Sequence, residues 1–264
     1  MKHLSRFYLG LVFAFLYLPI ILMIFFSFNS ADSLTQFSGF SFEKYADLFQ
    51  NEKLMGVLRD TLLIALLASF AASVLGTMAA IGLYNLRVKI RKLVMNVSNL
   101  PIVNPEIVTG VSLMLLFVRM KDFGLTLGFV SVLIAHILFN TPYVILNVLP
   151  RLRQMDMSLY EAALDLGCPP RRAFFKVVIP EIFPGVLAGF LMAFTFSLDD
   201  FVISYFTGGN FQTLSVYINN SLKKGVKPWM LALSGCMFLI VLIVLILMNV
   251  KDIRKEKLEN ARNF

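Results

Sequence analysis

Three carboxylates stand in or beside long apolar stretches, where charge is rare. Glu106 lies in the run N-V-S-N-L-P-I-V-N-P-E-I-V, and Asp199 and Asp200 lie in F-S-L-D-D-F-V-I-S-Y-F. A carboxylate near the centre of a bilayer costs about 2.5–3.5 kcal/mol on insertion scales, so Glu106 marks a functional site by default. The alternative is a protonated or helix-paired structural glutamate. Successive helical residues point about 100 degrees apart, so only one of the two aspartates faces a given spot if the helix continues, and which one stays open.

A polar face follows another apolar stretch. His136, Asn140, Tyr143 and Asn147 recur at intervals of three and four residues, which places them on one side of a helix. Such side chains either hydrogen bond to neighbouring helices or line a solute path, and both interpretations stay open. The pattern assigns no metal or catalytic role to His136.

The composition indicates that lipid surrounds most of the chain. Of the 264 residues, 58% are hydrophobic and 15% charged, and the mean hydropathy is +0.77. Soluble domains have about 45–50% apolar and about 25% charged residues. A soluble enzyme, a disordered chain and a disulfide scaffold are therefore excluded, and the two cysteines form no zinc or disulfide pattern. The net charge of +8 reflects basic loops between membrane spans better than nucleic-acid binding.

Six stretches reach the roughly 20 apolar residues that a membrane-spanning helix needs. They are 8–28, 61–85, 93–118, 123–149, 177–198 and 229–250. The first is longer than a signal-peptide core and is interpreted as a retained helix. Lys and Arg concentrate at the N-terminus, in two connections and in the tail 251–264, which predicts that both termini are cytoplasmic. We expect an all-α integral membrane protein with one domain, 1–264.

Two of these spans carry further local signals. Ser69, Ser73, Gly76 and Ala80 form a small-residue stripe, which lets another helix approach closely. Pro101 and Pro105 each remove a backbone donor from the third span, so we expect a broken helix there. Broken helices at membrane depth are tolerated where protein or a wet cavity satisfies the freed carbonyls.

The cytoplasmic connection 151–176 contains its own helix signals. Ser158 and Glu161 have capping-box spacing, Gly167 suits the end of that helix, and Pro169 and Pro170 suit the start of another. A helix, a turn and a second helix would project as one rigid knob. Its apolar side chains require a groove on a cytoplasmic partner.

This connection resembles the signature of bacterial ABC-importer permeases. The pattern is E-A-A, three residues, Gly, nine residues and then I-x-L-P, for which this chain has V-V-I-P. Glu161, Ala162, Ala163, Gly167 and Pro180 match outright. The resemblance implies a type I importer core, roughly 57–250, whose coupling helix docks in a separate ATPase subunit through these residues and Ser158.

The resemblance extends along most of the chain. The segments Y-L-P-I-I-L-M-I-F-F-S-F-N-S, N-P-E-I-V-T-G-V-S-L and F-T-F-S-L-D-D-F-V-I-S-Y-F-T-G look like spermidine/putrescine permeases of the PotC type, which typically have Asp where Glu106 stands. The resemblance implies a sister permease (PotB-type), two ATPase subunits (PotA-type) and an extracytoplasmic solute-binding protein (PotD-type). It also implies a place in the bacterial cytoplasmic (inner) membrane.

The chain has no G-x-x-x-x-G-K-[ST] phosphate loop, so ATP and Mg²⁺ are expected on the partner ATPase and no cofactor or catalytic residue on this chain. A linear polyamine suits separated carboxylates and aromatic faces. The predicted substrate path comprises Glu106, Asp199, Asp200, Tyr143, Asn140, Phe201 and Tyr205. Spermidine and putrescine are not distinguished. An ABC permease for another small solute and a stand-alone secondary transporter remain alternatives.

Overall fold

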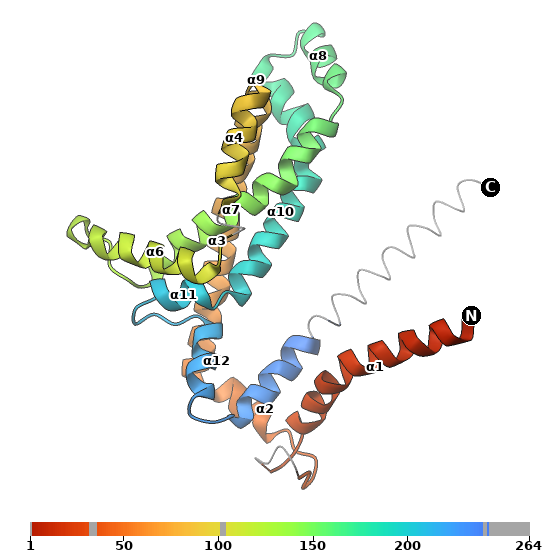
Figure 1. The fold of residues 1–264 in the computed structure, drawn as a ribbon, viewed down its shortest axis with the longest axis vertical. Coiled ribbons are helices and arrows are strands. Elements are labelled where there is room, and N and C mark those ends of the chain that lie inside the picture. The colour runs from red at the N-terminus through yellow and green to blue at the C-terminus, as the bar shows by residue number, and fades with distance from the viewer. Residues whose placement is uncertain (1, 32–35, 101–103, 240–241, 243–264) are drawn as a thin grey trace. The chain divides into compact units, whose positions relative to one another are not determined.

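The computed structural model describes residues 2–31, 36–100, 104–239 and 242. Within them the regular elements are helices, and one isolated β-bridge joins Asn29 and Phe40. In chain order (Figure 1) the helices are α1 (Lys2–Ser27), α2 (Glu43–Gln50), α3 (Glu52–Asn85), α4 (Val88–Ser98), α6 (Glu106–Arg119), η1 (Met120–Phe123), α7 (Phe129–Gln154), α8 (Met157–Asp165), α9 (Pro170–Ala173), η2 (Phe174–Val178), α10 (Ile179–Asp199), α11 (Val202–Thr207), α12 (Leu214–Leu222) and Pro228–Leu239. The predicted all-α class is confirmed.

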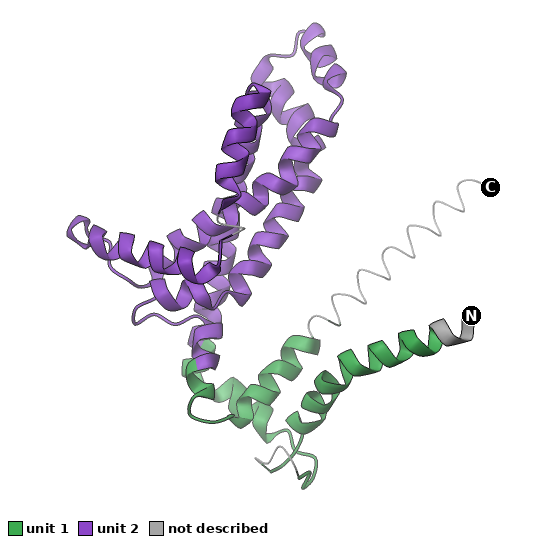
Figure 2. Ribbon diagram, viewed as in Figure 1, with its two compact units in different colours: residues 1–55, 220–264 green, residues 56–219 purple. Residues whose placement is uncertain are grey.

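The chain divides into two compact units (Figure 2). One unit combines residues 1–55 with 220–264, and the other comprises residues 56–219. In the first unit, the Ser27 hydroxyl lies 2.7 Å from the Tyr45 hydroxyl, which ties the end of α1 to α2. The second unit holds every residue predicted for the substrate path and for ATPase coupling.

Among the described residues, four helices are long and apolar enough to cross a membrane. They are Arg6–Ser27, Glu52–Asn85, Phe129–Gln154 and Pro170–Asp199. They correspond to the first, second, fourth and fifth predicted spans, with bounds shifted by several residues. The sixth span is described as a helix only to Leu239, and the rest of 229–250 lies outside the described residues apart from residue 242.

The third predicted span is interrupted. Helix α4 ends at Ser98 and α6 begins at Glu106, with Pro105 in an extended conformation as its N-cap. Proline fixes its own backbone and disfavours helix at the residue before it, which explains why α6 starts after Pro105. The predicted break is confirmed, while Pro101 lies outside the described residues.

The centre of the second unit is the contact between α3, α7 and α10. Helices α7 and α10 lie side by side (Figure 1). A Cβ atom added to Gly76 of α3 would lie 2.6 Å from Val144 Cβ of α7, and one added to Gly189 of α10 would lie 3.1 Å from Val144 Cα. Ser69 and Ala80 are fully buried on the same stripe as Gly76. The small residues therefore permit close helix approach, as predicted.

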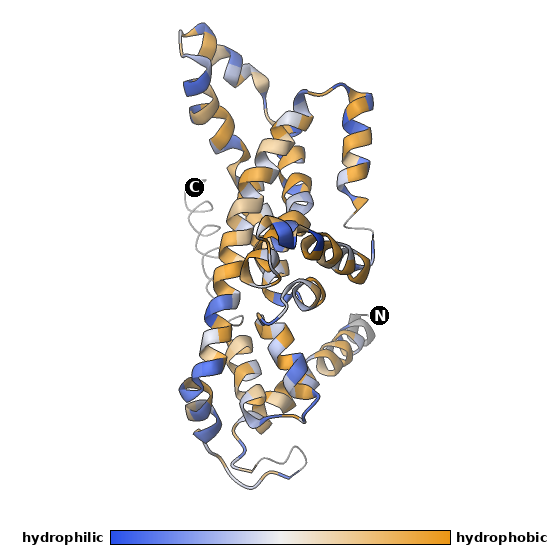
Figure 3. Ribbon diagram, turned by 90° about the vertical axis from the view of Figure 1, so that its left-hand side faces the viewer, coloured by the Kyte–Doolittle hydropathy of each residue, from blue (hydrophilic) through white to orange (hydrophobic). Residues whose placement is uncertain are grey.

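The same helices consist mostly of hydrophobic residues (Figure 3), and several of their large apolar side chains are exposed. Phe70 of α3 is 66% exposed, and Leu138 of α7 and Leu191 of α10 are also exposed. Soluble domains rarely expose so much apolar surface. This surface suits lipid or another membrane subunit.

Candidate functional site

Two neighbouring carboxylates at the end of α10 have opposite environments. Helix α10 ends at Asp199, Asp200 has an extended backbone, and α11 begins at Val202. We call residues 199–201 the elbow. The Asp199 residue is exposed, whereas the Asp200 side chain is only 5% exposed. The structure thus separates two residues that the sequence left equivalent.

The Asp200 carboxylate is bound on both sides of the elbow. One oxygen, Oδ2, lies 3.2 Å from His136 Nε2 of α7 and accepts the Ser204 amide hydrogen at 2.7 Å. The other oxygen, Oδ1, accepts the Ile203 amide hydrogen at 3.2 Å. These amides belong to the first turn of α11, where helix N–H groups lack partners within the helix. Asp200 therefore caps α11 and joins it to α7.

The His136 ring is enclosed by the same network. Its Nδ1 lies 2.6 Å from the Ser197 hydroxyl of α10, and its Nε2 lies 3.0 Å from the Ser204 hydroxyl of α11. His136, Ser197 and Ser204 are each 1% exposed. Buried polar groups are costly unless they are hydrogen bonded, and here each has a partner. We call His136, Ser197, Asp200 and Ser204 the latch.

Sequence reasoning did not identify the two serines of the latch. Ser197 and Ser204 are seven residues apart, a spacing that would place them on one face of a continuous helix, and this spacing was the available signal. In the structure the elbow divides the helix between them. Serine is common in apolar helices, however, and the local sequence does not indicate which distant residue will bind it. Their role appears only when the fold brings His136 between them.

Glu106 occupies the start of α6 and is exposed. Helix α6 packs against α11, and a Cβ atom added to Gly110 would lie 3.0 Å from Phe206 Cδ2. The break before Glu106 therefore places this carboxylate on a helix that contacts the segment following the elbow.

Aromatic rings form two groups near these carboxylates in the chain. Tyr143 contacts the ring of Phe196 at a centroid distance of 4.6 Å, and Phe201 contacts Tyr205 at 5.5 Å. Tyr205 is 47% exposed. Exposed aromatic faces attract cations, so the rings of the elbow and α11 are suited to a cationic solute.

The remaining polar residues of α7 differ in their partners. Asn140 is fully buried, and neither its amide nitrogen nor its amide oxygen has a hydrogen-bond partner among the described residues. Asn147 donates to the Tyr143 carbonyl of its own helix at 2.8 Å. The predicted polar face thus contains a helix–helix connector, His136, and an unsatisfied amide, Asn140.

The predicted coupling segment forms the helix–turn–helix that the sequence indicated. Helix α8 ends before Gly167, which has a φ of +81°. The amide hydrogens of Gly167 and Cys168 bond to the carbonyls of Leu164 and Ala163 at 2.8 and 3.0 Å. This pattern is a Schellman motif, in which glycine at the left-handed position satisfies the last helix carbonyls. Pro170 then begins α9, as predicted.

The predicted capping box is wrong. The N-cap of α8 is Asp156, whose carboxylate accepts the Ser158 amide hydrogen at 3.0 Å, in place of the Ser158–Glu161 pair. This hydrogen bond holds the pKa of Asp156 below its ordinary value. Both aspartate and serine are favoured caps, so the cap was available two residues earlier than expected.

The segment 156–170, which we call the knob, leaves its coupling residues accessible. Ser158, Glu161 and Ala162 are exposed, and no residue of α8 is buried. Leu159 is 53% and Leu166 88% exposed. Such apolar exposure outside the spans is typical of a surface that another protein covers.

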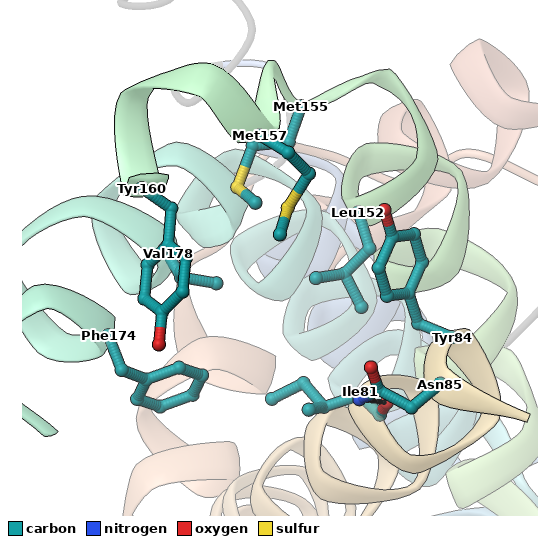
Figure 4. A pocket seen from close by; sticks show the side chains of 9 residues that line it. All are labelled: Ile81, Tyr84, Asn85, Leu152, Met155, Met157, Tyr160, Phe174 and Val178. Carbon is teal, nitrogen blue, oxygen red and sulfur yellow. Dashed lines mark hydrogen bonds between the residues drawn. The ribbon is translucent and has the colours of Figure 1, made fainter. Parts of the chain in front are cut away.

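A pocket of about 160 Å³ lies between part of the knob and the adjacent ends of α3 and α7 (Figure 4). Figure 4 shows the lining side chains, which are Ile81, Tyr84, Asn85, Leu152, Met155, Met157, Tyr160, Phe174 and Val178. The methionines are flexible side chains that adapt to irregular spaces. The knob is thus incompletely packed against the helices behind it.

Comparison with known proteins defines the class. Residues 72–256 match the family described as the binding-protein-dependent transport system inner membrane component. This match covers most of the chain, and the chain belongs to this family of ABC-transporter permease subunits. It is therefore a transport permease, not an enzyme, of the inner membrane.

Two individual relatives are permeases with named solutes. The chain is 37% identical over 227 residues to the putrescine transport system permease protein PotI of Escherichia coli K12, covering 84% of this chain and 81% of that protein. It is 36% identical over 250 residues to the spermidine/putrescine transport system permease protein PotC of Haemophilus influenzae, covering 92% and 96%. The predicted family resemblance is confirmed.

A solved structure supports the fold. The crystal structure of an amino acid ABC transporter with histidines matches with a TM-score of 0.54 and 21% identity, covering 82% of this chain and 100% of that chain. At this identity the likeness concerns the fold alone. It agrees with the type I importer architecture expected from the sequence.

Proposed function

We propose that this chain is the membrane permease that carries a polyamine of the spermidine/putrescine class into the bacterial cytoplasm. Its relatives are named as permeases for these solutes. The concentration of Lys and Arg in alternate connections supports an orientation with both termini in the cytoplasm. In this orientation the knob also faces the cytoplasm.

Solute recognition rests on the two accessible carboxylates. A polyamine carries ammonium groups separated by methylenes, and each charge suits a carboxylate. Glu106 and Asp199 are exposed, and this pair is the observation that carries the proposal. Phe201 and Tyr205 supply aromatic faces for the charges and the methylene stem.

The remaining predicted path residues have different requirements. Tyr143 packs against Phe196 of α10 and adds a hydroxyl to the path. Asn140 is fully buried in this conformation, so its contact with a solute requires α7 to move. A transport site binds weakly in at least one conformation, because a solute that enters must also leave.

Energy enters through the knob. In the proposed assembly, the chain pairs with a sister permease, receives the solute from an extracytoplasmic binding protein and contacts one of two ATPase subunits. ATP and Mg²⁺ bind to the ATPases. The rigid cap and Schellman turn of α8 transmit their closure as a rigid-body movement, which the pocket behind the knob accommodates.

The experiment is polyamine uptake by cells that lack their own importers and express the complete transporter. Glu106→Gln and Asp199→Asn are each expected to raise the KM for labelled putrescine or spermidine about tenfold, equal to about 1.4 kcal/mol of lost binding, with membrane abundance unchanged. Asp122→Asn, an exposed carboxylate in η1, is the control and should transport normally. Normal KM values in both path variants would refute the solute site.

A further inference from the structure

The latch connects three helices through one buried side chain. His136 comes from the first third of α7, Ser197 from the last turn of α10, and Ser204 from α11. Both ring nitrogens of His136 have partners at 3.2 Å or less. Two further hydrogen bonds join these helices in the described residues: the Ser131 hydroxyl of α7 donates to the Thr207 carbonyl of α11 at 2.8 Å, and the Asn147 amide of α7 donates to Met192 Sδ of α10 at 3.5 Å. The latch is the point at which polar contacts join all three helices.

The latch also determines which way the Asp200 side chain points. Asp200 accepts two amide hydrogens from the start of α11, and its side chain cannot turn toward the solute without breaking both. It would also leave His136 with one fewer partner in a site that water does not reach. Asp200 is therefore held inward, and its neighbour Asp199 is held outward.

We propose that His136 and Asp200 are positioning residues, which lock the elbow so that Asp199 and Tyr205 face the solute path. The statement about the path rests on the proposed function, whereas the locking of α11 does not. Asp200 acts through the backbone of α11 and His136 acts through Asp200 and the two serines. Neither residue contacts the solute.

Amide hydrogen exchange tests the locking directly. The full chain is purified with its co-assembling subunits, and exchange is followed in the peptide that contains α11 (Val202–Thr207). His136→Ala and Asp200→Ala are expected to raise exchange of the Ile203 and Ser204 amides at least tenfold. Asp200→Asn should raise it less, because asparagine retains a capping oxygen.

A matched control lies on α10. Thr195→Ala removes a hydroxyl whose partner among the described residues is the Leu191 carbonyl of its own helix, whereas Ser197→Ala removes a latch contact. Exchange in α11 should be unchanged in the Thr195 variant and raised in the Ser197 variant. Unchanged exchange in His136→Ala and Ser197→Ala would overturn the proposal, whatever the solute is.

Uptake kinetics test the positioning. His136→Ala should raise the KM for putrescine severalfold with a smaller change in maximal rate, and it should add little to the KM of Asp199→Asn. Full additivity of these two variants, or a fall in abundance with an unchanged KM, would overturn the positioning role. If Asp200→Asn raises the KM of Asp199→Asn further while His136→Ala does not, Asp200 binds solute directly and the proposal is wrong.

The experiments distinguish a wrong solute class from a failure of the latch to lock α11. If the unaltered transporter takes up neither putrescine nor spermidine, the solute class is wrong. The exchange experiment still decides whether the latch locks α11, because it requires no solute.

Discussion

The elbow after α10 buries one of its two carboxylates, that of Asp200, whereas the knob around α8 exposes its apolar side chains. At the elbow, the Asp200 carboxylate has three partners within the same chain, which are the His136 ring and two backbone amides. At the knob, Leu159 and Leu166 remain exposed and no residue of α8 is buried. The first region satisfies its polar groups within the chain, and the second leaves apolar side chains exposed, which the proposed ATPase contact would cover. Variants should therefore damage the packed region through folding and the knob through assembly.

The largest effect is expected in the packed helices. Gly76→Leu would force a side chain into Val144, whose Cβ would lie 2.6 Å from the added Cβ, and overpacking of this kind costs about 1–3 kcal/mol. Gly82 of the same helix has no atom within 4 Å of an added Cβ, so Gly82→Leu is the control. The yield of folded protein and its thermal midpoint should fall only in the Gly76 variant. Equal loss in both would mean that α3 does not pack on α7 at Gly76.

The next effect concerns the turn of the knob. Gly167→Val places a branched residue at a φ of +81°, which costs about 1–2 kcal/mol and breaks the Schellman motif. Gly124→Val is a matched control, because Gly124 has a φ of +86° and open space around it. Co-purification of the ATPase and polyamine uptake should be lost in the Gly167 variant and kept in the Gly124 variant. The same behaviour in both would remove the link between this turn and coupling.

A smaller effect is expected from the exposed leucines. The double substitution Leu159→Ser and Leu166→Ser should change the free energy of unfolding by no more than about 0.5 kcal/mol, because neither side chain is buried. It should nevertheless reduce co-purification of the ATPase. Phe123→Ser, at an 86% exposed position in η1, should have neither effect. Undiminished ATPase binding by the double variant would show that the apolar side of α8 is not the docking surface.

The smallest effect concerns the cap of α8. Asp156→Ala should increase amide exchange in the first turn of α8, whereas Asp156→Asn should not, because asparagine caps as well as aspartate. The hydrogen bond from Ser158 lowers the pKa of Asp156 in the folded state. Its contribution is therefore present above the ordinary aspartate pKa and is lost as pH falls through the lowered value. Exchange in α8 that is equal in the alanine and asparagine variants would contradict this role.

The same comparison explains what the sequence could predict. The knob follows local rules: Gly167 suits a left-handed position and Pro170 suits a first helical position, so both were predictable from residue type and spacing. The break before Glu106 was predictable for the same reason, because proline acts on its own backbone. The cap was misplaced because Asp156 and Ser158 are both competent caps within two residues.

The conformation of the elbow, by contrast, depends on tertiary contacts. Whether Asp199 or Asp200 turns inward depends on His136, which lies more than sixty residues earlier in the chain. No local pattern reports which polar groups will meet inside a membrane protein. Sequence alone therefore identified the carboxylates without separating their roles.

Reconstituted uptake tests the central claim most directly. Liposomes would contain either this chain alone or the chain with its sister permease, ATPases and binding protein, and labelled putrescine would be followed with and without ATP on the ATPase side. We predict accumulation only in the complete assembly with ATP, and loss of that accumulation in the Gly167→Val variant. Uptake by the chain alone, driven by an ion gradient and indifferent to ATP, would contradict the account.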